Sequence, residues 1–119
     1  MKTIKLNNGI EMPQIGYGVY QVSPDECERC VSDALKTGYR MIDTAQAYHN
    51  EEGVGRAVKN SGINRSDIFI VSKVWISNYG YEKAKASIDE SLRKLPRRSV
   101  ISWQKRSAIC GFSRTKTAK

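Results

Sequence analysis

The chain has 119 residues, of which 39% are apolar and 27% charged, a composition typical of one modest globular domain. It contains no apolar run of about 18 residues, and its alternating N-terminus lacks the apolar core of a signal peptide. We therefore expect a cytoplasmic protein without a membrane-spanning helix. Three cysteines, an odd number, indicate no disulfide framework. The motif CERC, with Cys27 and Cys30, lacks the further ligands of a zinc site, so we expect ordinary helix residues and no metal.

The positive charge is concentrated at the C-terminal end. Residues 1–95 carry 13 Lys and Arg against 12 Asp and Glu, whereas residues 96–119 carry 7 Lys and Arg and no acid. Most of the net charge of +8 therefore lies in the last segment. The change after Leu95 divides the chain into two parts of different composition.

Two short β elements are predicted first. The alternating segment TIKLNNGIEMPQIG predicts a β-hairpin, with Asn8 and Gly9 in its turn. The next segment, IGYGVY at residues 15–20, predicts a short strand that ends near Gly18.

A helix is predicted from Pro24 to Gly38. Ser23 and Glu26 have the spacing of a capping box, and Pro24 suits the first helical position. Gly38 suits the position just past the helix end.

Two more strand–helix units follow. Residues 39–45 predict a strand, and residues 50–62 predict a helix with Asn50 as its cap. Residues 66–75 predict a third strand, which is apolar enough to be covered on both faces, and residues 81–95 predict an amphipathic helix.

This alternation of strands and helices predicts parallel strands joined by right-handed crossovers. Two architectures fit, an open doubly wound sheet or part of a (β/α)₈ barrel. A dinucleotide-binding turn would need G-x-G-x-x-G, but after Gly16 and Gly18 the third glycine is replaced by Gln21. The glycines therefore indicate turn chemistry and not a Rossmann site.

Side chains suited to catalysis or ligand binding follow each predicted strand. Functional residues of parallel folds gather at these strand ends. The candidates after the three strands are, in chain order, Tyr17, Val19 and Tyr20, then Asp43, Tyr48 and His49, then Lys73 and Trp75.

Asp43 and Lys73 each follow an apolar run, so we expect them to pair at the edge of the core. An ammonium beside Tyr48 would lower the tyrosine pKa and suit it to protonate a carbonyl oxygen. The alternative is a purely structural ion pair with Tyr48 packed over it. A lone loop histidine such as His49 is expected to be solvated. Trp75, like Tyr20, would either wall an apolar pocket or be an ordinary surface aromatic.

The segments GYGVYQV, GYRMIDTAQAYHNEEGVGRAV and IFIVSKVWISNYGYEKAKASIDESLRKL resemble, in order and spacing, the N-terminal portion of the aldo-keto reductases. The resemblance covers residues 1–95 and is greatest to the bacterial branch that reduces small aldehydes and keto-sugars. It implies the N-terminal part of a (β/α)₈ TIM barrel with a hairpin closing its bottom, and NADPH-dependent reduction of aldehydes and ketones without a metal. By position, the resemblance implies that the catalytic residues are Asp43, Tyr48 (the proton donor) and Lys73. It implies that the cofactor is bound by Gly18, Val19, Tyr20 and Asp43. It also implies that the substrate is bound by Tyr20 and Trp75.

One expected part is missing. The family's fourth catalytic residue is a histidine after the fourth strand, but this chain has no histidine beyond His49. Residues 96–119 also lack the pattern of a central strand, and a full barrel needs about 250 residues. Our hypothesis is that this tail arises from a frameshift or a truncated gene copy. We therefore expect a marginally stable fragment that is inactive alone.

Two interactions are expected of such a fragment. The third strand would have an unpaired edge that permits self-association. The basic tail, with Trp103 and Phe112 among its cations, would bind nucleic acid or other polyanions nonspecifically. A non-enzymatic polyanion-binding protein is therefore the alternative function.

Overall fold

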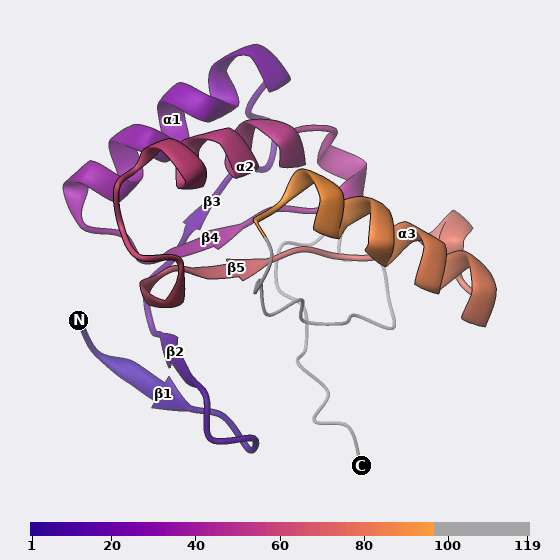
Figure 1. The fold of residues 1–119 in the computed structure, drawn as a ribbon, viewed down its shortest axis with the longest axis horizontal. Helices are drawn as coiled ribbons and strands as arrows, with labels where there is room; N and C mark the ends of the chain where they lie inside the picture. Colours follow the sequence, from indigo (N-terminus) through magenta and orange to yellow (C-terminus); the bar gives the residue numbers. More distant parts are fainter. Residues whose placement is uncertain (97–119) are drawn as a thin grey trace.

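The computed structural model describes residues 1–96, which form a small hairpin, a parallel sheet and three α-helices (Figure 1). The predicted character of residues 97–119, including the basic tail, lies outside this described part. The strands are β1 (Thr3–Lys5), β2 (Glu11–Pro13), β3 (Tyr17–Gly18), β4 (Met41–Asp43) and β5 (Phe69–Val71); the α-helices are α1 (Pro24–Thr37), α2 (Glu51–Asn60) and α3 (Tyr81–Lys94); the 3₁₀ helices are η1 (Gln46–Tyr48), η2 (Arg65–Asp67) and η3 (Ile76–Asn78).

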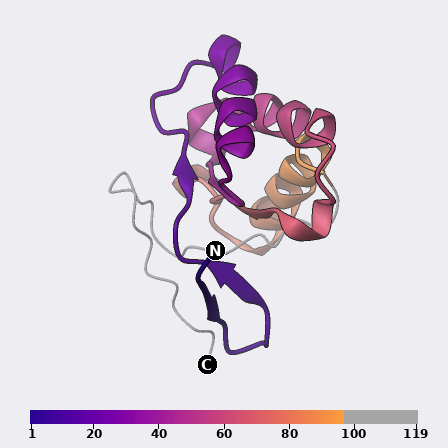
Figure 2. The ribbon, with the colours of Figure 1, turned by 90° about the vertical axis from the view of Figure 1, so that its left-hand side faces the viewer.

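The N-terminal hairpin forms as predicted. β1 and β2 pair antiparallel, with Ile4 opposite Met12. Gly9 adopts a left-handed φ of 84°, which the tight turn requires, and its N–H donates to the Leu6 carbonyl at 2.9 Å. The hairpin lies apart from the helices in both views (Figures 1 and 2).

The parallel sheet has the order β3-β4-β5, so that each strand pairs with the next one in the chain. Ile42 lies in register with Tyr17 on one side and with Ile70 on the other. The strands are shorter than the sequence predicted, and β5 has only one neighbour among the described strands. The last predicted residues of the third strand instead leave the sheet and run toward η3.

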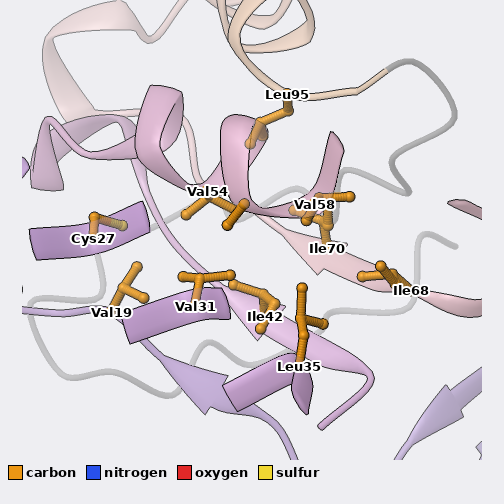
Figure 3. Close-up of a cluster of buried hydrophobic side chains, with 11 residues drawn as sticks. Val19, Cys27, Val31, Leu35, Ile42, Val54, Val58, Ile68, Ile70 and Leu95 are labelled. Atoms are coloured by element: carbon orange, nitrogen blue, oxygen red, sulfur yellow. The ribbon is translucent and has the colours of Figure 1, made fainter. Parts of the chain in front are cut away.

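The hydrophobic core lies between the sheet and the helices (Figure 3). Val31 of α1 and Val54 of α2 are fully buried, and they pack with Ile42 and Ile70 from the strands. Leu95, just past α3, closes the same cluster. No helix in the described part of the chain has the length and apolarity to cross a bilayer.

Glycines allow close approach around α2. A methyl group on Gly53 would lie 2.8 Å from the Cβ of Cys27 in α1. On Gly55 it would collide with the backbone carbonyl oxygen of Lys94 at the end of α3. These two positions let α2 pack directly against both neighbouring helices.

The predicted helix caps are partly wrong. Ser23 precedes α1 with an extended backbone and Pro24 follows it, but the Ser23 side chain makes no capping hydrogen bond. Ser23 is exposed, so water can serve the first helical N–H groups instead. The Asn50 side chain does not cap α2 either, because it is bonded elsewhere. The predicted end of α1 is confirmed, since Gly38 has a left-handed φ of 116° and its N–H bonds to the Ala34 and Leu35 carbonyls.

Candidate functional site

The carboxyl ends of the three parallel strands bring the predicted polar side chains together. Asp43 is the last residue of β4 and lies in register with Gly18 of β3 and Val71 of β5. Lys73 follows β5 by two residues, and Tyr48 ends the η1 turn that follows β4. The sheet edge therefore assembles polar side chains from two separate segments, one that begins at the end of β4 and one after β5.

Lys73 and Asp43 form the predicted ion pair. The ammonium nitrogen of Lys73 contacts Asp43 Oδ1 closely and donates to the Thr44 carbonyl at 3.0 Å. The Lys73 side chain is 7% exposed, whereas that of Asp43 is 30% exposed. An ammonium as buried as this one requires a compensating acceptor, and Asp43 supplies it.

The ring of Tyr48 lies close to a cation and to another aromatic ring. The Lys73 nitrogen is 5.3 Å from the Tyr48 ring centroid, and the Tyr20 ring is 5.2 Å away at a tilt of 54°. Burial raises the pKa of Tyr48 above its usual value, with smaller contributions from the Asp43 carboxylate and Tyr20.

The predicted lowering of the Tyr48 pKa is therefore wrong. The Lys73 ammonium is already compensated by Asp43, and it lies over the ring face. The partly buried phenol has less water to solvate a phenolate. At neutral pH the Tyr48 hydroxyl consequently carries its proton, which is the state a proton donor needs.

Asn50 fixes the turn that carries Tyr20. Its side-chain Nδ2 donates to the carbonyls of Val19 at 2.9 Å and Val22 at 3.0 Å, and its Oδ1 accepts from Thr44 Oγ1 at 2.8 Å. Sequence reasoning missed this role, because a polar residue immediately before a helix is ordinarily read as a cap. Asn50 thereby joins the turn after β3 to the end of β4.

The other predicted site residues divide between the site and the core. The side chain of Val19 is fully buried, and its N–H donates to the Asp43 carbonyl at 3.0 Å, so Val19 belongs to the core. Gly18 has open space where a side chain would be, and Tyr20 is 53% exposed. Trp75 is half-buried beside η3.

Three further residues singled out by the sequence lie outside the Asp43–Tyr48–Lys73 cluster. His49 is exposed with a left-handed φ of 55°. Cys27 and Cys30 lie in α1 as free thiols, and Cys27 Sγ donates to the Asn50 carbonyl at 3.5 Å. Within residues 1–96, no group of three side chains of the His, Cys, Asp or Glu type gathers as a metal site would require.

Residues 6–102 match the model of the Aldo/keto reductase family. The chain belongs to this family. An aldo-keto reductase of Mycolicibacterium smegmatis is 50% identical over 92 residues, which cover 77% of this chain and 34% of that protein. The glyoxal reductase of Bacillus subtilis is 50% identical over 94 residues, which cover 78% and 34%. A crystal structure of an aldo/keto reductase from Brucella melitensis superposes with a TM-score of 0.76 at 56% identity, over 78% of this chain and 36% of that one.

The chain thus spans about a third of the length of these aldo-keto reductases. Its parallel strands and helices are the N-terminal part of their (β/α)₈ barrel, as the sequence predicted, and the described residues form no closed barrel. The shared fold places the Asp43–Tyr48–Lys73 cluster at the carboxyl ends of the strands, where barrel enzymes hold their active sites.

Proposed function

We propose that this site is the proton-delivery part of an oxidoreductase that reduces aldehydes or ketones to alcohols. The observation that carries the proposal is the Tyr48 phenol held against the Lys73–Asp43 ion pair at the barrel's carboxyl edge. NADPH, when bound, would supply the hydride that adds to the carbonyl carbon. The Tyr48 hydroxyl would give its proton to the carbonyl oxygen, and solvent would then reprotonate the phenolate.

The chain's own residues divide this work. The raised pKa of Tyr48 keeps the proton on the phenol until the substrate oxygen gains negative charge. Lys73 then stabilises the phenolate to the extent that Asp43 leaves its charge uncompensated. Tyr20 and Trp75 would form aromatic walls for the carbonyl compound.

The turn after β3 fits a cofactor that approaches the backbone closely. A methyl group at Gly18 would meet no atom within 4 Å, so this strand end faces open space beside Asp43. Gly18, Tyr20 and Asp43 would therefore hold the NADPH, with Val19 supporting the turn from the core. The free thiols of Cys27 and Cys30 are consistent with the reducing cytoplasm, where we place the protein.

The test uses the purified full chain with NADPH and glyoxal, the substrate class in the name of the Bacillus subtilis relative. NADPH should quench the tryptophan fluorescence, and NADPH consumption after addition of glyoxal measures whatever activity this chain retains alone. Tyr48→Phe should lower any such turnover by about a hundredfold or more, because the proton donor is gone, while NADPH quenching persists. Gly18→Val should weaken quenching without lowering the unfolding midpoint.

Two results would refute the proposal. One is the absence of NADPH binding by a chain that unfolds cooperatively. The other is turnover that Tyr48→Phe leaves unchanged, which would point to a contaminating reductase.

The competing function is binding of polyanions through residues 96–119, which hold 7 of the 20 Lys and Arg residues. Heparin retention that disappears when 96–119 is deleted, with no NADPH response in the full chain, would favour it. Self-association through the outer edge of β5 is a further proposal, and sedimentation of the full chain tests it.

A further inference from the structure

The side chain of Gln46 makes a complete set of hydrogen bonds two residues before Tyr48. Its Nε2 donates to the Ser87 carbonyl at 2.8 Å and to Ser91 Oγ at 3.1 Å, both in α3. Its Oε1 accepts from the Trp75 N–H at 3.0 Å and from Asn78 Nδ2 at 3.4 Å. Both donors and both acceptor positions of the amide are therefore used.

These bonds extend the β4–β5 pairing beyond the strands. The Thr44 N–H donates to the Val71 carbonyl at 2.8 Å, and the Gln46 N–H donates to the Lys73 carbonyl at 3.3 Å. The next donor in the series, the Trp75 N–H, meets the side-chain oxygen of Gln46, because the main chain has already turned into η1. The side chain thus replaces a main-chain acceptor in a parallel ladder.

A buried carboxylate supports the same segment from the other side. Ser91 Oγ, which accepts from Gln46, donates to Glu51 Oε2 at 3.2 Å, and Ser72 Oγ contacts Glu51 Oε1. Glu51 and Ser91 are both almost fully buried. The residues on either side of the Lys73–Val74 pair, Ser72 and Trp75, are therefore held through one polar network.

We propose that Gln46 is a positioning residue for the substrate pocket. It fixes the segment with Lys73 and Trp75 relative to the turn with Tyr48, and so sets where the Trp75 wall stands beside the proton donor. This role rests on the proposed reductase function. Asn50, two residues after Tyr48, has the corresponding role for Tyr20, since it holds the turn that carries Tyr20.

The test measures hydrogen exchange at the Trp75 backbone amide. Trp75 and Trp103 are the two tryptophans of the chain, so ¹⁵N-tryptophan labelling in a Trp103→Phe background leaves one backbone signal. Gln46→Leu should speed exchange at Trp75 about tenfold or more, because it removes the acceptor. Gln46→Glu should keep exchange slow, since a carboxylate oxygen still accepts this N–H, although it loses the donors to α3. Gln14→Leu, at an exposed position beside β2, is the matched control and should change nothing.

Comparing Gln46→Leu with Gln46→Glu distinguishes the loss of the Trp75 hydrogen bond from a general loss of stability. Unfolding in urea should show both Gln46 variants to be less stable than the parent, whereas only Gln46→Leu accelerates Trp75 exchange. Equal exchange in the parent and Gln46→Leu would overturn the proposal, as would equal acceleration in both variants.

The exchange measurement contains neither NADPH nor substrate, so it is independent of the proposed reaction. If the unchanged chain reduces glyoxal, Gln46→Leu should raise the KM more than it lowers kcat, since the ion pair with Asp43 still holds Lys73 beside Tyr48. An unchanged KM in that variant would refute the link to the pocket. Absence of NADPH binding by a chain that unfolds cooperatively would refute the proposed function alone.

Discussion

The ammonium nitrogen of Lys73 lies 5.3 Å from the centre of the Tyr48 ring while its charge is paired with the carboxylate of Asp43. The tyrosine is thus close to a cation without receiving its full field. Burial of Tyr48 and the negative charge of Asp43 outweigh the effect of the Lys73 ammonium, so the pKa of Tyr48 is raised. The balance between these charges can be shifted by mutation.

Asp43→Asn should lower the pKa of Tyr48, because it removes a negative charge that raises this pKa and leaves the Lys73 charge uncompensated. The phenolate absorbance of Asp43→Asn, minus that of Asp43→Asn/Tyr48→Phe, isolates Tyr48 in an alkaline titration. Asp67→Asn, on the exposed η2 turn, is the control and should leave the titration unchanged. A Tyr48 pKa that is unchanged or higher in Asp43→Asn would contradict the assignment of the Asp43 charge as a cause of the raised pKa.

The two members of the ion pair should differ in their effect on stability. Asp43→Asn leaves a lysine that is 7% exposed without its counter-charge, and it should lower the free energy of unfolding by about 3 kcal/mol. Lys73→Met leaves a carboxylate that is 30% exposed and can recruit water, so it should cost about 1 to 2 kcal/mol. Urea unfolding of the two single variants shows which substitution costs more stability. Unfolding of the double variant Asp43→Asn/Lys73→Met gives the interaction energy of the pair. A larger loss in Lys73→Met would show that Asp43, and not Lys73, depends on the pair.

Stability should fall in alkali because of Cys27. Burial raises the pKa of this thiol from 9.0 to about 11. Between these pH values the unfolded chain loses the proton and the folded chain keeps it, so unfolding becomes more favourable as pH rises. The contribution is about 3 kcal/mol, present in full below pH 9 and lost by about pH 11. Urea unfolding at a series of pH values should show a shallower alkaline decline in Cys27→Ala, whereas Cys30→Ala should retain the decline of the parent.

Gly55→Ala should destabilise the contact between α2 and α3. The added methyl group would collide with the Lys94 carbonyl, and a backbone atom cannot move aside by changing rotamer. We expect a loss of about 2 to 3 kcal/mol in the free energy of unfolding, measured in urea. Gly18→Ala is the matched control, because its methyl group would enter open space. Equal stability of the two variants would mean that α3 withdraws from α2 at little cost.

The parts of this fold that are governed by local chemistry were predictable. Asn8 and Gly9 specify a turn by backbone conformation, and Gly38 ends α1 in the left-handed region for the same reason. The meeting of Asp43 with Lys73 followed from the rule that parallel strands end at one edge. These features depend on a few neighbouring residues or on one general property of the sheet.

The parts that depend on tertiary surroundings were not predictable. The side chain of Asn50 gains more from the buried carbonyls of Val19 and Val22 than from capping α2, which no local pattern reveals. The pKa of Tyr48 required the burial of the ring as well as its neighbours. Gln46 looked unremarkable because its partners in η3 and α3 lie about 30 to 45 residues away.

The sheet order β3-β4-β5 follows the order of synthesis. In this sheet β4 and β5 therefore each find a partner already made when they leave the ribosome. The Asp43 carboxylate likewise precedes the Lys73 ammonium by only about 30 residues. Pairings of such short range favour vectorial folding, in which the Asp43–Tyr48–Lys73 cluster can be assembled as soon as the segment after β5 has emerged.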